Sequence, residues 1–193
     1  MDQKQDIEAV AMLAEILDGL GIAYAIGGSM ASSVYGEARF TQDADITVEP
    51  FEPKAEQFLK AVEPLFYVSR EAMLDALRRR SSFNLIHLEM ALKIDVFVCR
   101  DSDFEKQLLP RRKFLRLAEG IENELPVVSA EDIVLLKLQW YRQGGCVSEN
   151  QWKDVLGVTK VQGKRLDVGY IGKWAKVLEV DDLLRKALKE AGI

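Results

Sequence analysis

The distribution of apolar and polar residues divides the chain into a strand-rich first part and a helical second part. Apolar and polar residues alternate over residues 43–48 and again over 92–98, which is the period of a strand with one buried face. From Ser129 onward, apolar residues recur every three to four positions, as they do in amphipathic helices. This order predicts an α+β protein, in which a mixed β-sheet flanked by helices is followed by a C-terminal helical bundle.

The same patterns predict individual elements and a domain boundary. Val10, Leu13 and Leu17 mark one face of an opening helix that ends at Gly21, since glycine commonly stops a helix. Further strands are expected at 22–26, 83–88 and 113–117, and further helices at 30–35, 54–62, 71–80, 103–109, 170–178 and 182–188. Ser129 and Ser148 are expected to cap two more helices. We expect one domain at 1–125, built on the sheet, and a helical region packed on it at 126–193.

Two aspartates share one face of the strand expected at 43–48. Asp43 and Asp45 alternate with Ala44 and Ile46, so both carboxylates point to the same side. Like charges about 4 Å apart repel by roughly 4 kcal/mol at an effective dielectric constant near 20. A divalent cation would remove that penalty, and carboxylate oxygens favour Mg²⁺ or Mn²⁺.

A glycine turn precedes this strand and suggests a phosphate site. Gly27 and Gly28 follow a buried apolar run, and glycine allows both a tight turn and a close approach of the backbone to a ligand. Ser29 then stands where a helix N-cap is expected. Backbone N–H groups, the positive end of a helix dipole and a hydroxyl together favour phosphate oxygens.

A third carboxylate lies on a later strand. Asp95 is flanked by Ile94 and Val96 near the middle of the second alternating segment, where an unpaired charge would be unfavourable. Beside Asp43 and Asp45 it would complete a site of three carboxylates.

These motifs together resemble the DNA polymerase β-type nucleotidyltransferase superfamily. The resemblance rests on Gly27-Gly28-Ser29, on Asp43-Ala44-Asp45 after thirteen intervening residues, and on Asp95 in an apolar strand. Within that superfamily, the stretches 41–46, 129–138 and 152–156 resemble the AbiEii-type branch of toxin nucleotidyltransferases and its uncharacterised relatives. Two departures are that Arg142 comes sooner than the arginine of that pattern, and that Lys153 stands where the last motif usually begins with arginine.

The resemblance implies a nucleoside triphosphate donor, ATP among the candidates, and a pair of Mg²⁺ ions, with Mn²⁺ as an alternative. Asp43 and Asp45 would correspond to the family's metal ligands. Asp95 would correspond to its third carboxylate, which binds metal and activates the incoming hydroxyl group.

The resemblance also implies a set of residues that bind the nucleotide. Gly28 and Ser29 would contact the triphosphate, and Lys137 would match the lysine that holds the donor phosphates. Asp154 would match the acidic residue of the last motif. Arg39, just before the metal-binding strand, is a further candidate contact to donor or acceptor. On spacing alone, the more common explanation of Lys137 and Asp154 is an exposed lysine and an aspartate paired with a nearby base.

Composition and charge narrow the functional classes. The chain has 193 residues, 48% of them hydrophobic and 30% charged, as in an ordinary globular protein with a substantial core. Its net charge of −5 argues against indiscriminate binding to nucleic acid, which needs a positive surface. The basic runs 78–80 and 111–113 are candidate RNA contacts, but solvated element ends are the more common explanation.

The remaining residues with potential chemistry suggest no separate site. Cys99 and Cys146 are the only cysteines, which excludes a disulfide framework or a cysteine-rich zinc site and fits a reducing cytoplasm. His87 is the only histidine and is better explained as a buried strand residue than as a ligand. We find neither a leader pattern nor an apolar run of about 20 residues, so no membrane association is expected.

The sequence thus predicts a Mg²⁺-dependent nucleotidyltransferase, similar to EC 2.7.7, which moves a nucleoside monophosphate to a hydroxyl acceptor. The acceptor could be an RNA end, a protein or a small molecule, and the protein could belong to a toxin–antitoxin pair with an antitoxin partner. One alternative is a catalytically silent module of the same fold that binds nucleotide or a partner. A metal-dependent phosphohydrolase is a second alternative, although such enzymes normally bring more histidine or acidic ligands.

Overall fold

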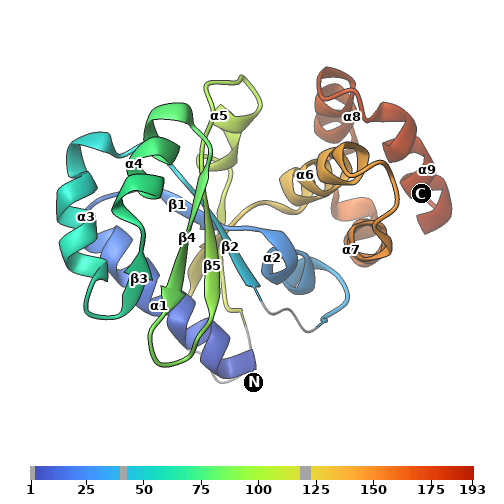
Figure 1. Ribbon diagram of the computed structural model, residues 1–193. Coiled ribbons are helices and arrows are strands. Elements are labelled where there is room, and N and C mark those ends of the chain that lie inside the picture. The colour runs from blue at the N-terminus through green and yellow to red at the C-terminus, as the bar shows by residue number, and fades with distance from the viewer. Residues whose placement is uncertain (1–2, 40–42, 118–122) are drawn as a thin grey trace. The chain divides into compact units, whose positions relative to one another are not determined.

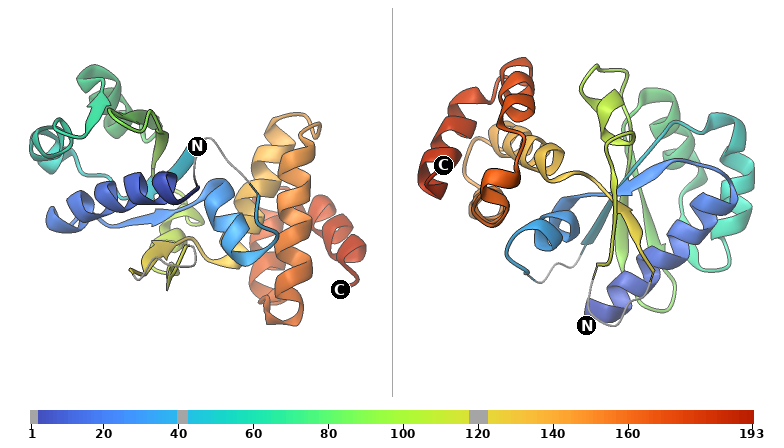
Figure 2. Two further views of the ribbon diagram at one scale, coloured as in Figure 1. Left: turned by 90° about the horizontal axis from the view of Figure 1, so that it is seen from below. Right: turned by 180° about the vertical axis from the view of Figure 1, so that it is seen from behind.

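The computed structural model describes residues 3–39, 43–117 and 123–193 (Figures 1 and 2), so Thr41 and Gln42 of the family-like motif lie outside the described residues. The chain folds into two compact units. The first contains the described residues up to 27 and from 43 to 127, and the second contains 28–39 and 128–193. The chain therefore enters the second unit twice.

The first unit is built on a mixed β-sheet. In the described residues its seven strands are β1 (Tyr24–Ile26), β2 (Asp43–Val48), β3 (Phe66–Val68), β4 (Ser82–His87), β5 (Lys93–Val98), β6 (Lys113–Leu115) and β7 (Leu125–Val127). They lie in the order β3-β4-β5-β2-β1-β7-β6. The pairs β2–β5 and β1–β7 are parallel, and the other neighbours are antiparallel. This mixed sheet confirms the predicted α+β fold class.

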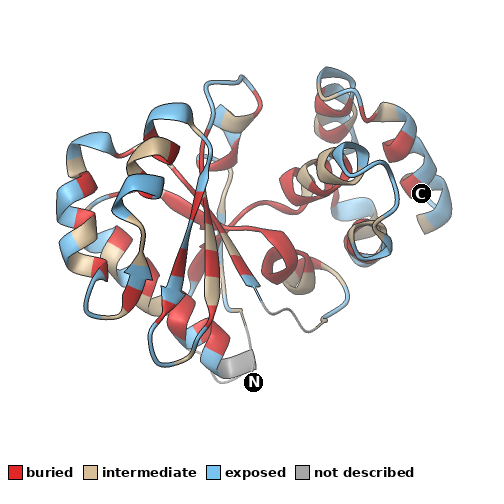
Figure 3. Ribbon diagram, in the orientation of Figure 1, coloured by how far each residue is buried: buried red, intermediate tan, exposed pale blue. Residues whose placement is uncertain are grey.

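Helices cover one face of the sheet. The helices of the first unit are α1 (Gln3–Gly19), α3 (Ala55–Val62), α4 (Arg70–Arg79) and α5 (Glu105–Leu108), with a 3₁₀ turn at Glu52–Lys54. Three of them, α1, α3 and α4, lie on the same side of the sheet (Figure 1). Apolar residues at alternate strand positions, among them Leu85, Ile94 and Ile46, are fully buried. Figure 3 shows this alternation along β4 and β5, whose other positions are exposed or half-buried.

The second unit is helical. It contains α2 (Gly28–Tyr35), α6 (Ala130–Gln143), α7 (Glu149–Gln162), α8 (Val168–Val177) and α9 (Asp181–Ala191), with a 3₁₀ turn at Gly163–Arg165. Ser129 and Ser148 accept hydrogen bonds from backbone N–H groups in the first turns of α6 and α7, as predicted for N-caps. The chain just after α2 packs closely on α7. A Cβ at Gly36 would lie only 2.6 Å from the backbone nitrogen of Val158.

Several details differ from the sequence prediction. The strands β3 and β7 were not predicted, because three residues are too few to display a period and β7 contains Pro126. The strand expected at 22–26 is confined to Tyr24–Ile26. Ser29 is not an N-cap, since α2 already begins at Gly28 and the Ser29 hydroxyl bonds to a distant arginine instead.

The segment 28–39 is the largest difference in domain organisation. The sequence suggested one boundary between 125 and 126, whereas in the structure this segment packs with the C-terminal helices through contacts of α2 with α6 and α7. No helix in the described ranges combines the length and apolar character needed to cross a bilayer.

Candidate functional site

Three aspartates of the first unit share one face of the sheet, and we call this set (Asp43, Asp45 and Asp95) the carboxylate face. Asp43 and Asp45 are two positions apart on β2, and Asp95 on β5 is the register partner of Asp45. Side chains of register partners in a parallel pair point to the same side, and neighbouring strands lie about 4.8 Å apart. Asp43 is exposed, whereas Asp45 and Asp95 are half-buried.

A backbone hydrogen bond links Gly27, which precedes α2, to strand β2. The backbone N–H of Gly27 donates a hydrogen bond of 2.8 Å to the carbonyl oxygen of Asp45. This bond continues the antiparallel β1–β2 pairing beyond Ile26, whose register partner is Ile46. The glycine turn therefore begins at the level of the carboxylate face.

A lysine that the sequence analysis did not assign also lies on this face. Lys93 is the register partner of Asp43, and its Nζ lies 2.9 Å from Oδ2 of Asp95. The hydrogen bond with Asp95 is the main cause of a raised pKa of Lys93, and the charges of all three aspartates add to it. The sequence does show that Lys93 lies two positions before Asp95, which puts both side chains on the same face of the strand. A single lysine on a strand has many ordinary explanations, however, and this spacing alone did not single it out.

The chemistry of the carboxylate face fits a divalent hard cation, because it offers carboxylate oxygens from neighbouring strands on one side of a sheet. Its present arrangement is not a closed metal site. Across the described ranges, no three His, Cys, Asp or Glu side chains are grouped so that they could hold one ion. The third carboxylate is instead paired with Lys93.

A second set of predicted residues comes together in the helical unit, and we call it the Asp154 cluster (Ser29, Arg39, Lys137 and Asp154). Arg39 donates to both carboxylate oxygens of Asp154, from Nε at 2.7 Å and from Nη2 at 2.9 Å. Lys137 Nζ donates to Oδ2 of the same carboxylate at 2.7 Å. Arg39 Nη2 also donates to the hydroxyl of Ser29.

The Asp154 cluster is largely buried and carries an excess of positive charge. The side chains of Lys137 and Asp154 are 3% and 4% exposed, whereas that of Arg39 is 32% exposed. Burial alone would raise the pKa of Asp154, but the hydrogen bond from Arg39 and the charge of Lys137 outweigh it, so this pKa is lowered. Two cations around one carboxylate leave one positive charge, which favours an anion at the half-buried Arg39.

The local folding explains why these residues meet. Gly28 has φ +53 at the start of α2, a conformation that costs a residue with a Cβ about 1–2 kcal/mol. Ser29 follows in the first turn of α2, and Lys137 and Asp154 lie on α6 and α7, which pack on α2 and on each other. The structure thus brings together four of the five predicted nucleotide-binding residues, and the fifth, Gly28, directly precedes Ser29. Lys137 is not an exposed lysine, contrary to the ordinary explanation of its charge.

The other candidate residues have structural explanations. His87 is 2% exposed on β4, its Nδ1 accepts from the N–H groups of Glu89 and Met90, and its ring packs edge-on against Phe66. This confirms its interpretation as a buried strand residue. In the basic run 78–80, two arginines pair with Asp75 on the exposed surface of α4, as expected of a solvated helix end.

Comparisons with known proteins identify the fold. No family model matches the sequence, and no curated protein is similar to it in sequence. Among solved structures, a nucleotidyltransferase-like antigenic protein from Paracoccidioides brasiliensis matches with a TM-score of 0.59 and 19% identity, over 98% of this chain and 94% of that one.

Two antibiotic-modifying enzymes also share the fold. ANT(2″)-Ia in complex with adenylyl-2″-tobramycin matches with a TM-score of 0.59 and 12% identity, over 92% of this chain and 98% of that one. The lincosamide adenylyltransferase LnuA with bound lincomycin matches with a TM-score of 0.50 and 14% identity, over 80% and 96%. At these identities the comparisons show that the chain has a nucleotidyltransferase-like fold.

Proposed function

We propose that this protein is a metal-dependent nucleotidyltransferase that moves a nucleoside monophosphate from a nucleoside triphosphate, such as ATP, to a hydroxyl acceptor. The observation that carries the proposal is the register of β2 and β5, which puts Asp45 opposite Asp95 with Asp43 on the same face. Three carboxylates on one face of a sheet repel one another, and positive charge near them lowers that repulsion. The fold shared with adenylyltransferases supports the same reaction class.

Asp43, Asp45 and Asp95 would hold Mg²⁺, or Mn²⁺, through their carboxylate oxygens. Two bound ions would supply positive charge that stabilises the attacking and leaving oxygens of a phosphoryl displacement. The resemblance to the polymerase β-type superfamily implied the same ligands, and oxygen donors of this kind are the chemistry that these ions prefer.

The reaction is a displacement at the α-phosphorus of the triphosphate. The acceptor oxygen forms a bond to that phosphorus, the bond from the α-phosphorus to the bridging oxygen breaks, and pyrophosphate leaves. The proton of the acceptor hydroxyl passes to the carboxylate of Asp95, which acts as general base.

The Asp154 cluster would bind the phosphates of the donor. Arg39 is the most exposed residue of the Asp154 cluster. Its guanidinium group pairs well with phosphate oxygens. Ser29 and the N–H groups at the start of α2 would add neutral donors. Asp154 fixes the guanidinium with two hydrogen bonds, and Lys137 supplies the charge that keeps the cluster positive.

A small molecule with a free hydroxyl group is the acceptor that we favour among RNA ends, proteins and small molecules. Two structures with the same fold contain an adenylylated aminoglycoside and lincomycin, and the net charge of −5 disfavours a large nucleic acid. The toxin–antitoxin role and its antitoxin partner stay predictions from the sequence motifs. Growth arrest on expression of the chain alone would test them.

Labelled nucleotides provide the direct test of transfer. The protein is incubated with each of the four triphosphates, labelled at the α-phosphate, together with Mg²⁺ and a cell extract, and the labelled products are identified by mass. We expect label on an acceptor with the wild type and at least a hundredfold less with Asp43→Asn, Asp45→Asn. Asp75→Asn, an exposed aspartate of α4, is the matched control and should transfer normally.

Three results would contradict the proposal. Equal labelling by the wild type and the double variant would remove the carboxylates from the reaction. Triphosphate binding without any labelled acceptor would favour the catalytically silent module. Release of inorganic phosphate to water, without labelled product, would favour the phosphohydrolase.

A further inference from the structure

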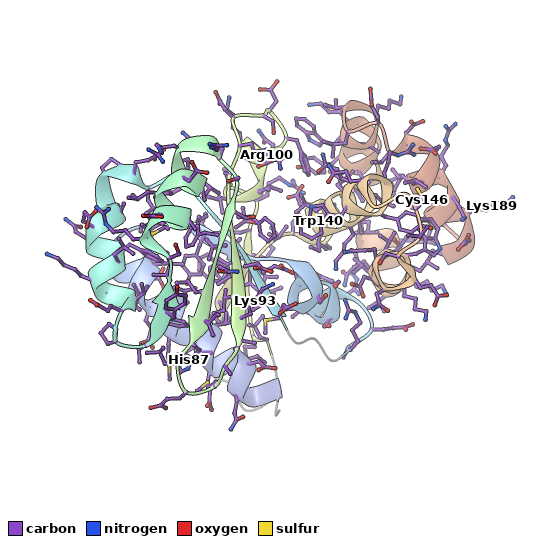
Figure 4. The ribbon with its side chains drawn as sticks, in the orientation of Figure 1. His87, Lys93, Arg100, Trp140, Cys146 and Lys189 are labelled. Atoms are coloured by element: carbon purple, nitrogen blue, oxygen red, sulfur yellow. The ribbon has the colours of Figure 1, made fainter. Side chains whose placement is uncertain are left out.

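Lys93 lies on the carboxylate face, beside Asp95. It stands opposite Asp43 in the β2–β5 register and two residues before Asp95 on β5. Side chains two positions apart on a strand share a face, so Lys93 projects from the same side of the sheet as the carboxylates. Figure 4 labels this lysine on β5.

The contact of Lys93 with Asp95 is a specific ion pair on a partly exposed surface. The Nζ to Oδ2 distance is 2.9 Å, with the two side chains 40% and 26% exposed. An ammonium group is a compact point charge on a flexible four-carbon stem. It can therefore neutralise one carboxylate of a repelling set, and it can also swing away without moving the backbone.

The same carboxylate cannot serve the lysine and a metal ion equally well. In the present arrangement Asp95 is engaged by Lys93, and the described acidic residues include no group of three ready to hold an ion. The proposed function, on which this inference rests, requires Asp95 to face a metal ion. We propose that Lys93 is a positioning residue that competes with the divalent cation for Asp95, pairing with this carboxylate until a cation displaces it.

This competition has two opposite consequences for a variant without the lysine charge. The metal-free protein loses the positive charge that is paired with Asp95 and becomes less stable, because the repulsion among the three carboxylates is then less compensated. The cation binds more tightly, because the ammonium group of Lys93 no longer has to be displaced from Asp95. For a pair of this exposure we expect affinity to rise about fivefold, which corresponds to about 1 kcal/mol.

Binding of Mn²⁺ tests the inference without any measurement of activity. Free Mn²⁺ is followed by electron paramagnetic resonance in titrations of the full chain, and thermal unfolding is recorded with and without saturating Mn²⁺. The variants are Lys93→Met, which removes the charge, and Lys93→Arg, which keeps it. Lys106→Met is the matched control, because Lys106 also pairs with an aspartate, Asp101, at 2.7 Å in the first unit.

We expect Lys93→Met to lower the dissociation constant for Mn²⁺ about fivefold, while Lys93→Arg and Lys106→Met stay within about twofold of the wild type. We also expect the melting temperature of Lys93→Met to lie below that of the wild type without metal and to approach it in saturating Mn²⁺. A purely structural role would lower both melting temperatures by the same amount and leave the affinity unchanged.

Removing Lys93 in the Asp95→Asn variant separates two effects on Mn²⁺ affinity, which are competition for Asp95 and general repulsion of the cation by a nearby positive charge. In Asp95→Asn the carboxylate that is competed for is absent, so removal of Lys93 should change the Mn²⁺ affinity much less than in the wild type. An undiminished effect there would overturn the inference. Equal affinities of wild type and Lys93→Met would also overturn it but leave the proposed function standing, whereas absence of Mn²⁺ binding by every variant would overturn both.

Discussion

The pairing of Lys137 with Asp154 predicts a large and specific loss of stability when the carboxylate charge is removed. Asp154→Asn keeps the shape of the side chain but leaves Lys137, whose side chain is 3% exposed, without a counter-charge. It also leaves two cations, Arg39 and Lys137, within hydrogen-bond distance of one uncharged amide. Breaking a buried ion pair in this way typically costs about 3–5 kcal/mol, and we expect a loss in that range.

The unfolding of the second unit can be followed separately by tryptophan fluorescence, so the loss of stability can be assigned to that unit. All three tryptophans of the chain, Trp140, Trp152 and Trp174, lie on its helices α6, α7 and α8. Urea unfolding followed by tryptophan fluorescence therefore reports the second unit, while far-ultraviolet circular dichroism reports the whole chain. The free energy of unfolding is obtained by linear extrapolation to zero denaturant.

A matched variant and a double variant decide whether the reasoning is correct. Asp181→Asn removes the same charge from a pair with Arg185 at 2.8 Å whose aspartate side chain is 44% exposed, and it should cost less than about 1 kcal/mol. Adding Lys137→Met to Asp154→Asn removes the stranded cation and should restore about 2 kcal/mol. A loss for Asp154→Asn no larger than that of Asp181→Asn would refute the argument.

Three further predictions follow from packing, titration and thiol burial. Gly36→Ala should destabilise the second unit by more than about 2 kcal/mol in urea unfolding, since its new Cβ would meet backbone at 2.6 Å; Gly172→Ala, with open space around it, should be neutral or stabilising by up to about 1 kcal/mol. The lowered pKa of Asp154 gives stability that is present above the unfolded value of about 3.9 and lost as pH falls through the folded value. Acid titrations by fluorescence should therefore be steeper below about pH 4 for the wild type than for Asp154→Asn. Burial raises the pKa of Cys99 to about 12, whereas Cys146 is exposed, so a thiol reagent should modify Cys146 in the folded protein and reach Cys99 only after unfolding.

The sequence alone determined the parts of this protein that have a period or a local signal. Alternation identified β2, β4 and β5, and serine caps located the starts of α6 and α7, because such features depend only on neighbouring residues. The same alternation put Asp43 and Asp45 on one face. The motif resemblance selected Ser29, Lys137 and Asp154, and the position of Arg39 before the metal-binding strand added that residue, before any contact among them was known.

Tertiary structure decided what depends on residues that are distant in sequence. The register of β2 with β5 sets Asp95 opposite Asp45 and Lys93 opposite Asp43, and no local pattern specifies a pairing between strands so far apart. Helix packing buries Lys137 against Asp154 and draws the segment 28–39 into the C-terminal unit. Burial, partner and register arise from the whole fold, and they determine whether a charged residue is a solvated surface group or part of a site.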